Sequence, residues 1–192
     1  MSLDWIIPAQ RIQKLPAYPF ARLDELKTKA REQGLDLIDL GMGNPDGATP
    51  EAVVDAAIQA LKNPDNHGYP PFEGTANFRN AITTWYHRRY GVNLDPDSEA
   101  LPLLGSKEGL GHLALAYVDP GDVVLVPSPS YPVHFRGPVI AGGEIHSLIL
   151  QPENDWLIDL AKIPDSIAQR AKILYFNYPN NPTAATAPRE FF

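Results

Sequence analysis

The sequence predicts an α/β fold built around a mostly parallel sheet. Short apolar runs alternate with helical patterns in the second half of the chain, and the run Ile173-Leu174-Tyr175-Phe176 ends in a proline-rich polar loop. Such alternation is typical of parallel strands joined by right-handed crossovers. The 20 prolines fall at the edges of these elements, so they separate parts of one fold rather than mark a linker.

The composition excludes several classes of protein. Hydrophobic residues make up 44% and charged residues 20%, which indicates a globular chain. The net charge of -7 argues against a nucleic-acid partner, because phosphate backbones are bound by clustered Lys and Arg. Without cysteine the chain has no disulfides and no thiolate catalysis, and its five histidines lack ligand spacing, so no metal site is predicted. No apolar run approaches the roughly 18 residues of a membrane span, so no membrane partner and a cytoplasmic location are expected.

The first elements surround a glycine-containing loop. After an irregular segment 1–18, apolar spacing predicts a helix over 19–33, and Leu37-Ile38-Asp39-Leu40 reads as a short strand. The strand leads into the loop 41–46, where Gly43 lets the main chain approach a ligand closely, although a plain turn is an alternative. Thr49-Pro50-Glu51 then predicts a helix start with Thr49 as cap. The apolar stripe expected to be buried on this helix is Val54, Ala57, Ile58 and Leu61.

The loop 68–74 precedes a further helix that carries Phe78, Ile82 and Trp85. Tyr69 in this loop is either a ligand-binding residue or an aromatic that covers the edge of the core. Arg79, in the helix, is interpreted as structural.

A short buried strand over 101–104 is predicted to run into Gly105-Ser106-Lys107 and a helix. The first turn of a helix has free N–H groups and the positive end of the dipole, so it binds anions. Ser106 adds a hydroxyl and Lys107 a positive charge. The alternative is that Ser106 only caps the helix.

Two more polar loops follow predicted strands. Strands are expected at 122–126, 144–150 and 172–176, and helices near 133–140 and 160–170. Tyr131 lies in the loop after the first of these strands and could equally cap the core. The loop after the last strand presents Asn180 and Asn181 between prolines, which fix its backbone. Polar loops at the carboxyl ends of parallel strands are where α/β proteins hold ligands.

The run Asn177-Tyr178-Pro179-Asn180-Asn181-Pro182-Thr183 resembles the signature of fold-type I pyridoxal-phosphate (PLP) aminotransferases of class I and II. The loops at Gly43, Tyr69, Ser106 and Tyr131 match the same family in order, whereas Ala184 stands where the family usually has glycine. The resemblance implies the N-terminal portion of the PLP-dependent transferase fold, a three-layer αβα arrangement that is incomplete here. It implies an N-terminal arm and part of the small domain over 1–45, and the first part of the large PLP-binding domain over 46–192.

The resemblance also implies roles for the loop residues. Ser106 and Lys107 would hold the PLP phosphate, Tyr131 would stack on the pyridine ring, and Asn181 would hydrogen-bond the phenolic oxygen of the cofactor. Tyr69 would reach the phosphate in the other subunit of a homodimer, and the backbone of Gly43 would bind the substrate α-carboxylate. The implied reaction transfers an amino group between an amino acid and an α-keto acid.

The family places its Schiff-base lysine downstream of this signature, so that lysine is expected beyond Phe192 and no catalytic residue is assigned within the chain. The 192-residue chain alone is therefore expected to be an inactive, truncated part of an aminotransferase. The tail Asn-Asn-Pro-Thr-Ala-Ala-Thr-Ala is most similar to the subgroup of LL-diaminopimelate, alanine and aspartate aminotransferases.

Other functions stay open at this point. The chain could be a non-enzymatic remnant that dimerises through the Tyr69 region, or part of another fold-type I enzyme such as a lyase. Dependence on an α-keto acid separates a transaminase from a lyase. A phosphate-binding Rossmann protein is a weaker alternative, because the chain lacks the Gly-x-Gly-x-x-Gly motif.

Overall fold

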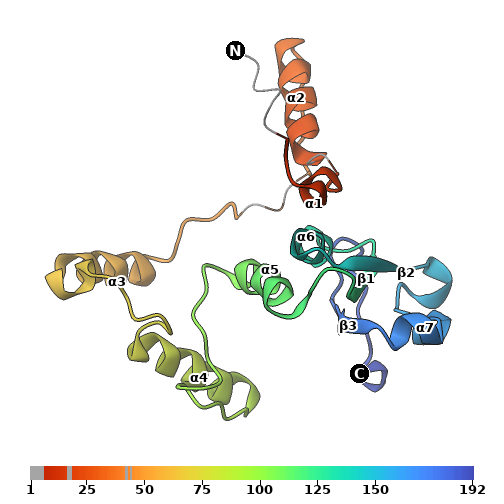
Figure 1. Ribbon diagram of the computed structural model, residues 1–192. Helices are drawn as coiled ribbons and strands as arrows, with labels where there is room; N and C mark the ends of the chain where they lie inside the picture. Colours follow the sequence, from red (N-terminus) through yellow and green to blue (C-terminus); the bar gives the residue numbers. More distant parts are fainter. Residues whose placement is uncertain (1–6, 17–18, 42, 44) are drawn as a thin grey trace. The chain divides into compact units, whose positions relative to one another are not determined.

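The computed structural model describes residues 7–16, 19–41, 43 and 45–192 (Figure 1). The chain forms two compact units, one comprising Tyr18–Pro102 and the other Met1–Ala17 together with Leu103–Phe192. This division follows compactness and does not test the predicted boundary between residues 45 and 46, which stays a prediction.

The unit with residues 103–192 contains three parallel strands, β1 (Val123–Ser128), β2 (Glu144–Ile149) and β3 (Ala171–Leu174). Their order in the sheet is β2-β1-β3, with Val124 of β1 opposite Ile145 on one side and Ile173 on the other. The prediction of parallel strands joined by crossovers is confirmed. Because all three strands point the same way, their following loops lie at one edge of the sheet.

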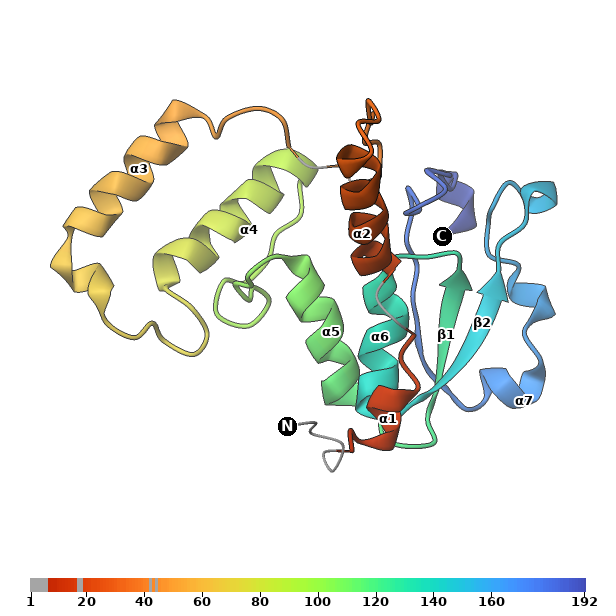
Figure 2. The same ribbon diagram turned by 90° about the horizontal axis from the view of Figure 1, so that it is seen from above.

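This unit has three layers, and the central strand β1 lies in the middle one, the sheet (Figure 2). Val124 and Val126 face α5 (Ser106–Tyr117) and α6 (Pro132–Ala141), where they pack with Ala114 of α5. Val123 and Leu125 face the opposite side, where Ile167 of the short helix α7 (Asp165–Ala168) packs against them. Side chains alternate between the two faces of a strand, so β1 is buried on both. The αβα layering implied by the resemblance is confirmed in this unit.

Short helical segments complete this unit. Helix α1 (Gln10–Gln13) contacts α6, and 3₁₀ turns lie at Pro152–Asn154 (η2), Leu160–Lys162 (η3) and Arg189–Phe191 (η4). The single helix predicted over 160–170 is wrong, because η3 and α7 are separate elements. Pro164 lies between them with extended backbone, which interrupts the helix.

The regular structure of the unit of residues 18–102 is helical, as far as its described residues show. It contains α2 (Pro19–Glu32), α3 (Glu51–Lys62), η1 (Pro64–His67) and α4 (Ala76–Tyr90). The predicted strand over 37–40 is absent from this unit, and the one predicted over 101–104 is not formed either. An apolar run becomes a strand only where another strand offers hydrogen-bond partners, and neither run pairs with one among the described residues.

Two predictions for α3 are also wrong. Pro50 occupies the N-cap position with non-helical backbone, so Thr49 lies outside the helix and does not cap it. The apolar stripe has helical spacing, but none of its residues is buried, and Leu61 is 71% exposed. Helical spacing determines which residues share a face, whereas burial requires a second surface against that face.

Candidate functional site

The first turn of α5 presents unused polar groups. Gly105 is the N-cap, with φ +85°, and makes no side-chain capping bond. Ser106 is therefore the first helical residue, and its exposed hydroxyl is not the cap. The alternative in which Ser106 merely caps the helix is wrong, because Gly105 occupies the cap position, with a positive φ that glycine adopts readily. The 12-residue helix directs its positive end toward this turn.

Glu108 is the acidic residue in this first turn. Its Oε2 accepts a hydrogen bond of 2.7 Å from the Leu104 N–H, and its Oε1 lies 4.0 Å from His112 Nδ1. The carboxylate thus satisfies the backbone N–H of Leu104, which lies just before the helix. Lys107 supplies the opposite charge at the same turn, so the turn is not left with a net negative side-chain charge.

Lys107 and Tyr131 come together across the two loops. The Lys107 ammonium lies 5.5 Å from the centre of the Tyr131 ring, within the range of a cation–π contact. Tyr131 is half-buried and occupies the N-cap position of α6, directly after the loop that follows β1. The structure therefore joins the start of α5 to the loop after β1.

The loop after β3 is tied to the same place by Asn180. This side chain is 3% exposed; its Nδ2 donates to Thr183 Oγ1 at 2.9 Å and to the Pro129 carbonyl at 3.4 Å. Its backbone N–H donates to the Ala185 carbonyl at 2.8 Å. Asn180 thus holds the loop closed, while the neighbouring Asn181 is exposed. Loops after β1 and β3 and the first turn of α5 converge on residues 128–132.

His134 lies under this site, and the sequence interpretation missed its position. His134 is 4% exposed, and its ring stacks on that of Tyr175 with the two ring centres 4.8 Å apart. The Tyr131 ring meets it edge-on, with the ring centres 6.1 Å apart. Its Nδ1 has no hydrogen-bond partner within the described part of the chain. Burial lowers the pKa of His134, which keeps the imidazole neutral. The spacing of Tyr131 and His134, three residues apart at a helix start, is the signal that could have revealed it.

Gly43 and Tyr69 belong to the unit of residues 18–102. A side chain at Gly43 would have no neighbour within 4 Å, so its backbone is accessible. Tyr69 is fully exposed, so the alternative in which it covers the edge of the core is wrong for this unit. Both roles implied by the resemblance stay predictions.

The residues at the converging loops fit a phosphorylated aromatic ligand such as PLP. The first turn of α5 offers amide donors, the Ser106 hydroxyl and the Lys107 ammonium to a phosphate. Tyr131 offers a ring face, and Asn181 an exposed amide. No group of three or more His, Asp or Glu residues in the described ranges is placed to hold a metal ion. Nor is any helix of those ranges long and apolar enough to cross a membrane.

Comparison with known proteins supports this interpretation. Residues 35–192 match the family described as aminotransferase class I and II. The chain is 50% identical over 184 residues to the LL-diaminopimelate aminotransferase of Aquifex aeolicus (strain VF5), covering 96% of this chain and 48% of that protein. It spans about half the length of the curated relatives that it matches.

Solved structures agree with the sequence matches. The apo-BacF structure from Bacillus subtilis has a TM-score of 0.88 and 38% identity, with 97% of this chain and 48% of that chain covered. A probable N-succinyldiaminopimelate aminotransferase from Thermus thermophilus has a TM-score of 0.83 and 43% identity, with 90% and 46% covered. The family is PLP-dependent, and the fold is the N-terminal part of a fold-type I domain. The chain therefore belongs to the class I and II aminotransferase family.

Proposed function

We propose that the complete protein carrying this chain transfers an amino group from an amino acid to an α-keto acid, and that this chain supplies the phosphate and ring side of its PLP site. The observation that carries the proposal is the convergence of two loops and the first turn of α5 on residues 128–132. Lys107 reaches Tyr131 from α5, and Asn180 reaches Pro129 from the loop after β3. Membership of an aminotransferase family gives the reaction class.

In this proposal each residue of the site has its own part in binding the cofactor or the substrate. The first-turn amides of α5, the Ser106 hydroxyl and the Lys107 ammonium bind the phosphate with hydrogen bonds and opposite charge. The Tyr131 ring orients the cofactor plane, and Asn181 donates a hydrogen bond on the phenolic side. PLP, when bound, withdraws electrons from the substrate Cα. The Gly43 backbone orients the substrate carboxylate.

Two finer proposals concern partners and substrate. Tyr69 is fully exposed on a loop, as expected of a residue that reaches the phosphate site of a second subunit, so we propose a homodimer. The relatives at 45–50% identity are named LL-diaminopimelate aminotransferases, which makes LL-diaminopimelate the first amino donor to test. Both proposals apply to the complete protein.

The test is a PLP titration of the complete protein as its gene encodes it, followed by an assay for amino transfer. We expect the absorbance band of bound PLP, and keto-acid-dependent turnover with LL-diaminopimelate. Ser106→Ala is expected to weaken PLP binding about tenfold, the effect of losing one hydrogen bond to a charged group. Leu115→Ala, at an exposed position of the same helix, is the matched control and should leave PLP affinity unchanged.

The outcomes separate the alternatives. Turnover that does not require an α-keto acid would show a lyase instead of a transaminase. Failure of the wild-type protein to bind PLP would overturn the proposal.

A further inference from the structure

Arg79 is buried although it is charged. It is 8% exposed, and only Arg79 and Thr83 are buried in α4. Burying a guanidinium is costly unless its N–H groups find acceptors. The position of these acceptors therefore shows what the residue holds in place.

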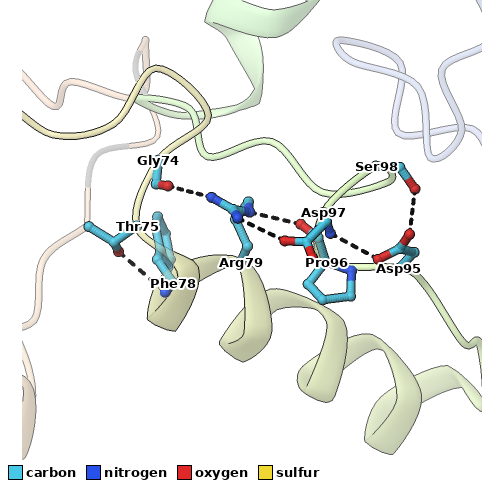
Figure 3. Close-up of polar contacts among 8 residues, drawn as sticks. All are labelled: Gly74, Thr75, Phe78, Arg79, Asp95, Pro96, Asp97 and Ser98. Carbon is cyan, nitrogen blue, oxygen red and sulfur yellow. Dashed lines mark hydrogen bonds and ion pairs between the residues drawn. The ribbon is translucent and has the colours of Figure 1, made fainter.

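All three guanidinium nitrogens are bonded (Figure 3). Nη1 donates to the Gly74 carbonyl, Nε to the Pro96 carbonyl at 2.8 Å, and Nη2 to Asp97 Oδ1 at 2.9 Å. The Asp97 side chain is largely exposed, so the ion pair by itself contributes little. The two carbonyls matter more, because they belong to segments on either side of α4.

The segment with Pro96 and Asp97 is a turn that is stabilised by its own hydrogen bonds. The Asp95 carboxylate accepts the Asp97 N–H at 3.0 Å and the Ser98 hydroxyl at 2.7 Å. These bonds lower the pKa of Asp95. The Asp95 N–H donates to Glu99 Oε2 at 2.8 Å. Arg79 is thus anchored on one side to a turn with its own hydrogen bonds.

The other segment ends the loop that carries Tyr69. Gly74 has φ +81°, and its N–H donates to the Pro71 carbonyl at 2.9 Å. A Cβ at Gly74 would meet Pro102 Cγ at 2.5 Å, so only glycine fits. Pro70 and Pro71 fix φ between Tyr69 and this turn. Arg79 therefore holds the end of a loop whose backbone after Tyr69 is already restricted by two prolines.

We infer that Arg79 is a positioning residue that holds loop 68–74 so that the exposed Tyr69 is pre-organised to bind the phosphate of PLP. The inference rests on the proposed function. A loop that is already ordered loses less conformational entropy when its tyrosine binds a ligand, which favours affinity. Arg79 itself does not touch the ligand.

The test is a double-mutant cycle on PLP affinity in the complete protein, with Arg79→Lys and Tyr69→Phe alone and together. Lysine keeps the charge, but it has one nitrogen where the guanidinium uses three, so it cannot reach all three acceptors at their present positions. We expect Arg79→Lys to raise the Kd for PLP about fivefold when Tyr69 is present. In the Tyr69→Phe background the same change should raise it less than about twofold, because the effect passes through the tyrosine hydroxyl. Equal effects in both backgrounds would show a merely structural role and overturn the inference.

Two further variants keep the test decisive. Pro71→Gly loosens the same loop at an exposed position and should reproduce the dependence on Tyr69 even if Arg79→Lys does not fold. Asp97→Asn retains both carbonyl bonds of Arg79 and is the control, with the Kd expected within about twofold of wild type. A loss in Asp97→Asn as large as that in Arg79→Lys would contradict the inference.

Hydrogen exchange gives a readout that does not involve PLP. In Arg79→Lys the Gly74 amide, which donates to the Pro71 carbonyl, should exchange faster, while the amides of residues 83–90 in α4 keep their rates. Unchanged exchange in the loop would overturn the positioning role. Failure of the wild-type protein to bind PLP would instead overturn the proposed function, and the exchange data would still decide whether Arg79 orders the loop.

Discussion

The Lys107 ammonium lies 5.5 Å from the centre of the Tyr131 ring, which joins the first turn of α5 to the start of α6. One residue offers charge and the other a ring face, and a phosphorylated aromatic ligand needs both. The contact also keeps the ammonium near the helix end where an anion would bind.

Tyr131 is predicted to act through its ring. Tyr131→Phe keeps the face and should leave PLP affinity within about twofold of wild type, whereas Tyr131→Ala should lose about tenfold, the scale of an aromatic stacking contact. Absorbance titration with PLP measures both. Equal losses in the two variants would assign the effect to the hydroxyl instead.

The adjacent asparagines are predicted to separate stability from binding. Asn180→Ala removes the bonds to Thr183 and Pro129 from a buried side chain and should lower the free energy of unfolding by about 1–3 kcal/mol. Asn181→Ala alters an exposed side chain, so stability should change by less than about 0.5 kcal/mol, while PLP affinity falls. Urea unfolding and PLP titration of both variants check this. Two equally destabilised variants would contradict the assignment.

Two glycines are predicted to respond oppositely to alanine. At Gly143 a Cβ would lie 2.6 Å from Val118 Cγ1, and Val118 is buried, so Gly143→Ala should destabilise the protein by about 1–3 kcal/mol. At Gly111, inside α5, the nearest atom would be Val133 Cγ2 at 3.8 Å. Gly111→Ala should therefore stabilise by up to about 1 kcal/mol, the difference in helix propensity. Thermal unfolding measures the change in stability of each variant. A change of the same sign in both variants would disprove the packing argument.

His134 is predicted to make stability depend on pH. Burial lowers its pKa in the folded state below the ordinary 6.5, so the unfolded chain binds the proton first as the pH falls. The stability is complete above pH 6.5 and declines below it, by at most about 1.4 kcal/mol for each pH unit. His134→Phe keeps a ring against Tyr175 and should flatten the change in urea midpoint between pH 7.5 and 5. If the urea midpoint of that variant changed with pH as much as that of the wild type, the pH dependence would belong to other groups.

Much of the helical structure could be predicted from the sequence, and the site could be predicted as a set of loops. The spacing of apolar residues located α2, α3 and α4, and strand–helix alternation gave the parallel sheet. The strands expected at 37–40 and 101–104 failed, because a strand depends on a partner that local sequence does not specify. Burial of the stripe on α3 failed for the same reason, since a face is covered only by another element.

At the site, the chain itself determined which residue types follow which strand: hydroxyl and lysine at a helix start, tyrosine after β1, asparagines between prolines after β3. Only the tertiary structure decided which of these residues are structural and which are available to a ligand. It placed Gly105 rather than Ser106 at the cap, buried Asn180 and left Asn181 exposed, and put His134 beneath Tyr131. The physical reason is that residue type and local spacing limit the chemistry available, whereas burial and contacts between distant loops arise only when the sheet brings those loops to one edge.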